Sequence, residues 1–250
     1  MSTSSKKPAA LLQEPQAPQG RQRSTGAATN PVGRPVGRNS DQTRLAILDV
    51  AEGLFAELGY EGTSIRDIAL QCNVQAAVVG YHFGTKAELF DAIVGRRAAI
   101  INEVRTRALD AQLGVLKGRP LRIEMLVENY VAPLLEATTH GEPGWRNFAS
   151  LMGRLANSPR GTEMVNKHYS KVAFRYMQEF RRALPKVPEG RLTDAFLYMV
   201  AAMLFVCADT GRWEAMVRHG NKKHRSTRAI LDHLVPFVTG GFSALAKDRG

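Results

Sequence analysis

Residues 63–89 read TSIRDIALQCNVQAAVVGYHFGTKAEL, and the rest of the chain is organised around this stretch. Thr63 or Ser64 is a good helix N-cap, and Ser64 with Asp67 has the spacing of a capping box, in which two residues satisfy each other's backbone amides. Asn73 tolerates the left-handed backbone of a tight turn. The stretch therefore predicts two short helices joined by a turn, which is the arrangement of a helix-turn-helix.

The second short helix, predicted over about residues 75–83, has two different faces. The side chains expected to turn toward a core are Val74, Val78 and Val79. The outward positions are Gln75, Ala76, Ala77, Gly80, Tyr81 and His82. Small residues at the start would let this helix approach a DNA major groove closely, and the Tyr-His pair at its end could reach phosphates.

A third helix is predicted to begin at a second capping box, formed by Thr85 and Glu88. Lys86 lies in its first turn, where free amides and the positive helix end already favour an anion. We therefore expect a DNA-binding surface made of Thr63, Ser64, Arg66, Gln75, Ala76, Ala77, Gly80, Tyr81, His82 and Lys86.

A spaced set of residues in this region resembles the signature of the TetR family of bacterial transcriptional regulators. The set comprises Phe55, Gly59, Tyr60, Thr63, Ser64, Ile65, Ile68, Ala69, Val74, Tyr81, Phe83, Lys86 and Leu89. The resemblance covers residues 41–101 strongly, and the remainder by helical character and length. It implies a homodimer, most often a repressor, that contacts successive major grooves of a palindromic operator and responds to a small effector. The chain departs from the family at Gly80, where a larger side chain is usual, so one candidate base contact is missing.

Composition limits the classes of protein to which the chain can belong. Its 250 residues carry a formal net charge of +11 and a pI near 10.0, which favours an acidic partner such as nucleic acid or an anionic membrane. The 44% hydrophobic content is ordinary for a protein with a core. Two cysteines, Cys72 and Cys207, are too few for a disulfide framework and indicate reduced thiols in the cytoplasm.

Residues 1–40 are predicted to form a disordered basic arm, because they are poor in aromatic residues and rich in Ser, Pro, Gln and Gly. The longest aliphatic patch is Leu11-Leu12, so no signal peptide is expected. Arg34 and Arg38 lie in a Pro-Val-Gly-Arg repeat before the first helix, and arms of this kind can enter the minor groove. A solvated tail is the alternative, above all for residues 1–30.

The rest of the chain reads as helices separated by Gly/Pro-rich connections. The predicted helices cover residues 41–58, 85–113, 121–138, 145–156, 162–184, 195–208 and 227–239. We find no run of alternating β-branched residues long enough for a sheet. The predicted fold is all-α: a three-helix helix-turn-helix domain over residues 41–86, then a larger helical ligand-binding and dimerisation domain over residues 87–250.

Residues 195–208 are apolar throughout, which predicts a helix buried on every side, since the run is shorter than the ~18 residues of a bilayer span. In the family, the last two long helices pair with those of a second subunit. The dimer interface is accordingly predicted at Phe196, Met199, Met203, Ile230, Leu234 and Val238. An intramolecular core would give the same pattern.

Bulky, adaptable side chains gather in the middle helices. They are Met125, Tyr130, Trp145, Phe148, Met152, Phe174, Met177 and Met203. Such stripes are often plain core, but the family resemblance implies an effector pocket among them. The run over residues 129–155 is similar to members that respond to fatty acids or acyl-thioesters, which predicts a small apolar effector.

Other classes of protein find little support in the sequence. We find no GxSxG, GxGxxG, GxxxxGK[ST], HExxH or CxxC motif, and the six histidines lack metal-ligand spacing, so no catalytic residue, metal or cofactor is predicted. A membrane-surface protein would need a basic amphipathic helix, and the cations instead lie in the arm and in scattered loops. A ligand-independent DNA-binding protein or an activator of the same family remains open.

Overall fold

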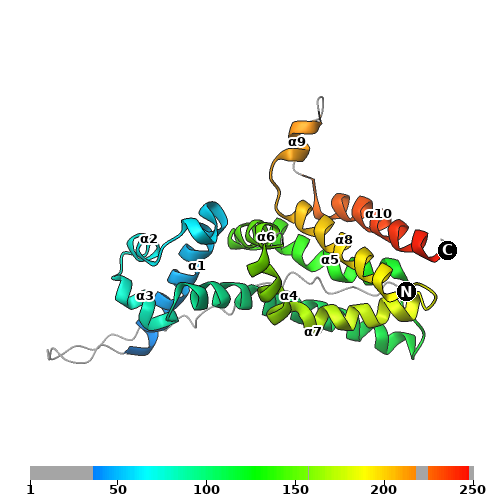
Figure 1. The fold of residues 1–250 in the computed structure, drawn as a ribbon, viewed down its shortest axis with the longest axis horizontal. Coiled ribbons are helices and arrows are strands. Elements are labelled where there is room, and N and C mark those ends of the chain that lie inside the picture. The colour runs from blue at the N-terminus through cyan, green and yellow to red at the C-terminus, as the bar shows by residue number, and fades with distance from the viewer. Residues whose placement is uncertain (1–35, 157, 218–224, 248–250) are drawn as a thin grey trace, which may run out of the picture.

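The computed structural model describes residues 36–156, 158–217 and 225–247, and in these ranges all the regular structure is helical (Figure 1). Three helices form a small group at one end of the elongated molecule: α1 (Val36–Gly62), α2 (Ile65–Gln71) and α3 (Ala76–Phe83). The long α4 (Lys86–Leu116) begins beside them and runs into the larger group, so that one helix belongs to both parts (Figure 1). The predicted all-α fold and its two-part order are confirmed.

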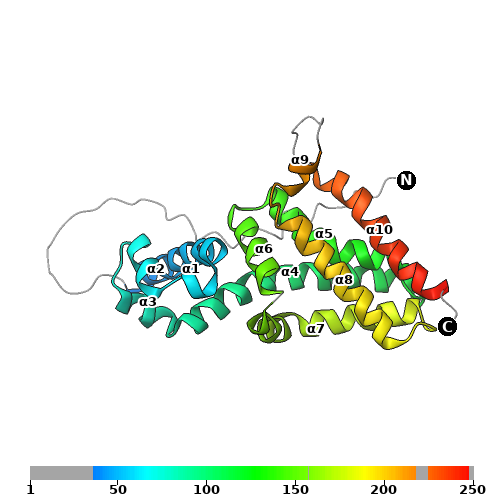
Figure 2. The same ribbon diagram turned by 45° about the horizontal axis from the view of Figure 1, so that its top comes forward.

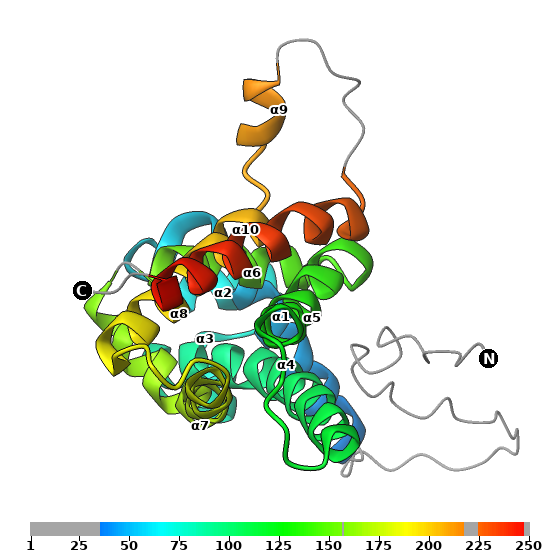
Figure 3. The ribbon, with the colours of Figure 1, turned by 90° about the vertical axis from the view of Figure 1, so that its right-hand side faces the viewer.

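The larger group packs around α4. It contains α5 (Ile123–His140), α6 (Gly144–Leu155), α7 (Pro159–Ala183), α8 (Glu189–Cys207) and α10 (Thr227–Lys247). The helix α10 packs on α5 and α8, while α6 reaches α1 and so touches the small group (Figure 2). The short α9 (Arg212–Met216) projects from the body next to the end of α8 (Figure 3).

The turn chemistry read from the sequence is confirmed. Ser64 Oγ accepts from the Asp67 amide at 3.1 Å, and Asp67 Oδ2 accepts from the Ser64 amide at 3.0 Å. Thr85 and Glu88 make the same reciprocal pair before α4. Asn73 has a φ of 53°, the left-handed conformation expected of the turn residue. These bonds set where α2 and α4 begin, and therefore how α3 is held between them.

The first helix differs from the prediction at its start. It begins at Val36 rather than at the predicted Asp41. At its end the backbone leaves the helix at Gly59, with a φ of 77°, as expected. Residues 1–35, including Arg34, lie outside the described residues, and Arg38 lies within α1.

The last helices also differ from the prediction. α8 begins at Glu189 rather than at residue 195, and α10 continues past the predicted residue 239, through Gly240 and Gly241, to Lys247. Phe242 explains the extension: it is buried and stacks on Phe180, with ring centroids 4.4 Å apart, which offsets the glycine cost. α9 was not predicted, since five residues are too short to show a period.

The outer face of α8 contradicts the expected burial on every side. Leu197, Tyr198 and Phe205 are exposed, while Phe196, Met199, Met203 and Cys207, three or four positions apart on the same helix, fill the core. α8 and α10 are the helices, among the described residues, that are long and apolar enough to cross a membrane by length and composition. Their inner faces pack in the core, so part of this apolar character serves the fold.

Candidate nucleic-acid interface and effector cavity

The exposed face of α3 is the centre of the predicted DNA-binding surface. Val79 and Phe83 bury the opposite face, which leaves Ala76 and Ala77 outward and Tyr81 82% exposed. The rings of Tyr81 and His82 lie edge to face, 5.3 Å apart between centroids. The sequence-based division of this helix is confirmed at Ala76, Ala77, Val79 and Tyr81, whereas Val78, Gly80 and His82 are all half-buried. Contact with DNA stays a prediction.

Gly80 lies on the same helix, and a Cβ added to it would meet no atom within 4 Å. The glycine is therefore not required by packing. In a docked recognition helix, the absence of a side chain would allow the backbone to come closer to the base edges.

We expect Gly80→Ala to raise the free energy of unfolding by about 1 kcal/mol, because alanine is the better helix former. It should also weaken operator binding, on the order of tenfold, since one disturbed base contact costs ~1–3 kcal/mol. Gly114→Ala is the matched control: that glycine lies on α4 with equally open space, so it should stabilise the protein and leave DNA binding unchanged. Equal DNA affinity of both variants, by fluorescence anisotropy, would remove Gly80 from the interface.

Thr63 does not belong to the interface. Its side chain is buried, and Oγ1 donates to the carbonyls of Gly59 at 2.9 Å and Leu54 at 3.2 Å. The hydroxyl thus ties the end of α1 to the start of α2, and the prediction that it contacts DNA is wrong. Ser64 is exposed, but its hydroxyl bonds to Asp67 within the capping box, whereas Arg66 is exposed on α2.

Cations lie beside the end of α3. Lys86 Nζ is 4.3 Å from the centroid of the Tyr60 ring, which holds the ammonium at the start of α4. The guanidinium of Arg44, on α1, lies 4.9 Å from the Phe83 ring centroid and is exposed. The sequence did not point to Arg44, because only the fold brings this residue of α1 next to Phe83 of α3.

Lys86→Ala should weaken binding to all DNA sequences alike and lower the salt slope of binding by about one unit, as the loss of one phosphate contact requires. Anisotropy titrations at several salt concentrations measure both quantities. An unchanged slope would show that the ammonium serves only its contact with Tyr60.

The larger helical group contains a cavity of about 400 Å³ lined by residues of α4, α5, α6, α7 and α8. Its lining is mostly apolar: Ile101, Arg105, Tyr130, Leu134, Phe148, Met152, Ala156, Gly161, Thr162, Val165, Asn166, Tyr169, Ala173, Phe196, Leu197, Val200, Met203 and Leu204. The volume lies within the ~300–1,000 Å³ usual for small-molecule sites. Of the predicted pocket residues, the structure brings Tyr130, Phe148, Met152 and Met203 to this cavity.

Four predicted pocket residues lie elsewhere. Phe174 is 68% exposed, because it is two positions from both Val172 and Tyr176, which face inward on α7. Met125 and Met177 are half-buried against the core, outside the cavity lining. Trp145 is fully buried, but it packs on Arg97 rather than on the cavity. Hydrophobic type alone could not separate these positions.

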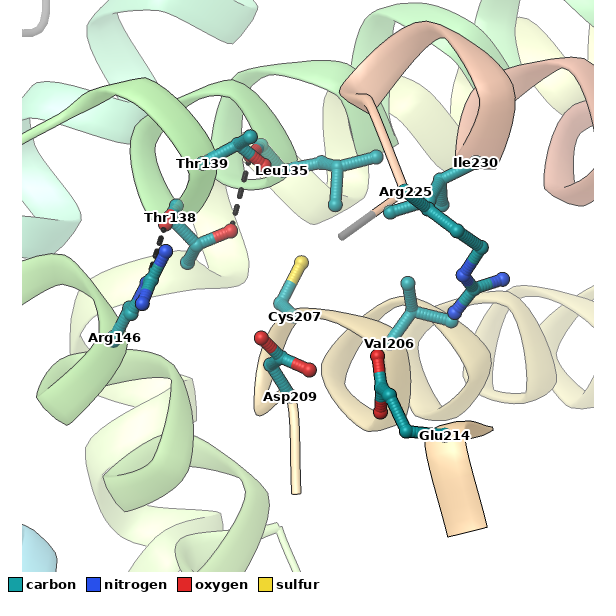
Figure 4. A pocket seen from close by; sticks show the side chains of 10 residues that line it. All are labelled: Leu135, Thr138, Thr139, Arg146, Val206, Cys207, Asp209, Glu214, Arg225 and Ile230. Atoms are coloured by element: carbon teal, nitrogen blue, oxygen red, sulfur yellow. Dashed lines mark hydrogen bonds between the residues drawn. The ribbon is translucent and has the colours of Figure 1, made fainter. Parts of the chain in front are cut away.

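A second cavity, of about 60 Å³, lies between α5, the end of α8 and the start of α10 (Figure 4). It is polar, and its size suits water rather than an apolar effector. Figure 4 shows Thr138 and Thr139 on one side and Cys207 with Asp209 on the other.

Burial raises the pKa of Cys207 to about 12, so the thiol stays protonated and is a poor nucleophile. No group of three or more His, Cys, Asp or Glu side chains suited to a metal occurs in the part of the chain that the structure describes.

A buried ion pair joins the two parts of the molecule. Glu52 of α1 is 1% exposed and Arg97 of α4 is 2% exposed; Nε and Nη2 of the arginine lie 3.1 Å from the carboxylate oxygens. Arg96 Nη2 also contacts Glu52, at 2.5 Å. The guanidinium of Arg97 lies 4.6 Å from the Trp145 ring centroid, and a Cβ on Gly144 would overlap Nη2. The start of α6 is thus built around this pair.

For five of the six predicted dimer-interface residues, burial within the chain contradicts a surface role. Phe196, Met199, Met203, Leu234 and Val238 are buried within the one chain, and Ile230 is half-buried. These positions form the seam between α8, α10 and their neighbours, because the core-facing stripe of each helix is also its most apolar stripe. The exposed apolar residues on the outer faces are instead Leu197, Tyr198, Phe205 and Phe237.

A groove between α8 and α10, of about 630 Å³, runs along this outer face. Tyr198 and Phe237 line it from opposite helices. The groove and the exposed aromatic residues give the two helices a partly apolar outer face.

Two family models match the chain. The model of the bacterial regulatory proteins of the tetR family matches residues 47–93, and that of the tetracyclin repressor-like C-terminal domain matches residues 128–241. The first covers the helix-turn-helix and the start of α4, and the second covers most of the cavity and α10. Both parts of the fold are therefore assigned separately to one family.

Part of the chain matches proteins that are named as transcriptional regulators. The HTH-type transcriptional repressor Rv3405c of Mycobacterium tuberculosis is 44% identical over 70 residues, which are 28% of this chain and 36% of the relative. The negative transcriptional regulator IcaR of the Staphylococcus aureus biofilm operon icaADBC is 42% identical over 48 residues, 19% of this chain and 26% of IcaR. The matched segments thus span about a third or less of these relatives' length.

A solved structure shares the fold over most of the chain. The ketosteroid transcriptional regulator KstR2 of Mycobacterium tuberculosis superposes with a TM-score of 0.55 at 15% identity, over 79% of this chain and 93% of that chain. At this identity the likeness shows the fold alone. With the family matches at both ends of that fold, the chain belongs to the TetR family of bacterial transcriptional regulators, which are DNA-binding proteins and not enzymes.

Proposed function

We propose that the protein is a homodimeric transcriptional repressor that leaves a palindromic operator when a small apolar effector enters the cavity. One observation carries the proposal: α4 belongs to both sites. Lys86 begins it beside α3, and Ile101 and Arg105 of the same helix line the cavity. A ligand that displaces the cavity wall can therefore tilt the small group of α1, α2 and α3 that carries the proposed DNA-binding surface.

The ion pair between the two parts supports a second route for the same coupling. Phe148 and Met152 of α6 line the cavity, and Trp145, one turn earlier, packs on Arg97. Arg97 in turn holds Glu52 of α1. Because half-sites repeat at about 34 to 36 Å, a shift of a few ångströms between two DNA-binding groups is sufficient to lose one half-site.

The outer faces of α8 and α10 support the homodimer. Exposed aromatic residues on adjacent helices would be costly on a monomer, and a two-fold pair of these helices would bury both faces at once. The interface in this proposal contains Tyr198, Phe205 and Phe237 in place of the buried residues expected from the sequence. The protein then acts in the cytoplasm, where its operator lies.

The names of Rv3405c and IcaR support repression, through a likeness in the DNA-binding segment. An activator of the same fold would differ only in whether the ligand-bound shape fits the operator. The members that respond to fatty acids or acyl-thioesters supply the candidate effectors, since their ligands suit a mostly apolar cavity of this size.

Footprinting on DNA upstream of the protein's own gene, with and without a panel of medium-chain fatty acids and their thioesters, tests the proposal. A protected inverted repeat that is lost on adding ligand is the expected result. Protection that strengthens with ligand would identify the activator instead, and the absence of any protected site on this or randomised DNA would exclude the DNA-binding role.

A further inference from the structure

Arg105 is a buried cation at the cavity wall. Its side chain is 2% exposed, it lies on α4, and it is the one ionised residue in a lining that is otherwise apolar or neutral, as far as the described residues show. A guanidinium remains charged in a protein, and burying such a charge is costly unless an opposite charge or strong acceptors compensate.

The protein compensates this charge only in part. Among the described residues, Arg105 Nε donates to the Tyr130 carbonyl at 2.8 Å, Nη2 points to the Met203 sulfur at 3.3 Å, and the guanidinium lies 3.8 Å from the Tyr130 ring centroid. A thioether is a weak acceptor, and none of these groups carries a negative charge. The contrast with Arg97, which has Glu52 as a buried counter-ion, is clear.

The surrounding side chains cannot supply the missing anion. Burial raises the pKa of Tyr169 in the lining and of Tyr176 behind it, so both phenols stay neutral despite the nearby arginine. The Tyr176 hydroxyl donates to the Arg105 carbonyl at 3.0 Å, which fixes the backbone of α4 at this point. Tyr176 thus holds the main chain of Arg105, and Tyr130 holds its guanidinium.

We propose that the effector is an amphiphile with a carboxylate, whose head group pairs with Arg105 and whose apolar chain fills the rest of the cavity. The inference rests on the proposed function, because it names the ligand of that same cavity. Arginine and carboxylate form strong, directional pairs, and the low-polarity wall strengthens them further. Three residues of the lining are exposed: Thr162, Asn166 and Leu197. The cavity is therefore open to solvent between α7 and α8, and a ligand can enter there.

Direct binding to the purified full chain tests this without DNA. Calorimetry would compare decanoate with decanol and methyl decanoate, which keep the chain but lose the charge, and with acetate, which keeps only the head group. Decanoate should bind on the order of ten- to a hundredfold tighter than the two uncharged probes, as expected for a hydrogen-bonded charge pair. Acetate should bind far more weakly, because it leaves the apolar wall unfilled.

Two variants separate the charge from the fold. Arg105→Met should abolish the preference for decanoate while still binding decanol, and Arg105→Lys should retain part of the preference. Arg107→Met is the control, since Arg107 lies on the same helix, exposed and paired with Glu103. Equal binding of the three chain probes to the wild-type protein, no binding of any probe, or a decanoate preference that survives in Arg105→Met would each overturn the proposal.

Operator binding then separates the proposed function from the carboxylate site at Arg105. If decanoate binds through Arg105 but the protein binds no DNA, the proposed function fails and the carboxylate site stands. If the operator is bound and released by uncharged ligands alone, the function stands and Arg105 is not the effector's partner.

Discussion

Glu52→Ala should lower the free energy of unfolding by about 3 to 5 kcal/mol, because it removes the buried carboxylate that pairs with the Arg97 guanidinium and leaves the longer contact with the exposed Glu142, at 3.7 Å. Urea denaturation followed by circular dichroism measures the loss. Arg107→Met is the matched control, since it breaks an exposed pair with Glu103 and should cost less than about 1 kcal/mol.

Replacing both members of the pair separates stability from coupling. Glu52→Leu with Arg97→Met should recover most of the lost stability, because apolar residues of similar volume often replace a buried ion pair without penalty. This double variant should still bind operator and ligand separately, but ligand should release the DNA less effectively. Full ligand response in the double variant would show that the ion pair only holds the fold together.

Phe237→Glu together with Tyr198→Glu should convert the dimer to monomers and reduce operator affinity by about a hundred- to ten-thousandfold, the range expected when a second linked site is lost. Phe237 is 76% exposed, so the charges should cost the protomer little stability. Sedimentation velocity measures the mass, and anisotropy measures the binding.

Two controls make the dimer result specific. Phe174→Glu introduces the same charge at an exposed aromatic residue on α7 and should leave the dimer intact. Leu234→Asp should instead unfold the protomer, because Leu234 is buried within the chain. A double variant that still sediments as a dimer would place the interface elsewhere.

The sequence was most informative where local chemistry determines the backbone. The capping boxes at Ser64 and Thr85, the left-handed Asn73 and the end of α1 at Gly59 all depend on residues within a few positions of one another. The same holds for the faces of α3, whose period is short and regular. The course of the backbone from the end of α1 to the start of α4 could therefore be predicted closely from the sequence.

Positions that depend on tertiary packing were harder to predict. A hydrophobic stripe shows that a helix face is apolar, but not whether a neighbour in the same chain or a second chain covers it. Hence Leu234 and Val238 were expected at an interface and lie in the core. Phe174, expected in the pocket, faces solvent, because its position on α7 lies between the inward-facing Val172 and Tyr176.

The cations at the two sites show a similar limit. Arg44 and Arg105 are ordinary helical arginines in the sequence, and no local motif marks either of them. Only the fold places one against Phe83 at the end of α3 and the other, without a counter-ion among the described residues, at the wall of a cavity.

Selection of bound sequences from a pool of randomised DNA tests the central claim most directly, since it needs no knowledge of the operator. We expect the wild-type protein to enrich an inverted repeat with half-sites about one helical turn or a multiple apart. An Ala77→Glu variant, which adds a carboxylate to the exposed face of α3, should enrich nothing. Enrichment of the same repeat by both proteins would contradict DNA recognition through α3, and failure of the wild-type protein to enrich any sequence would contradict the proposed function itself.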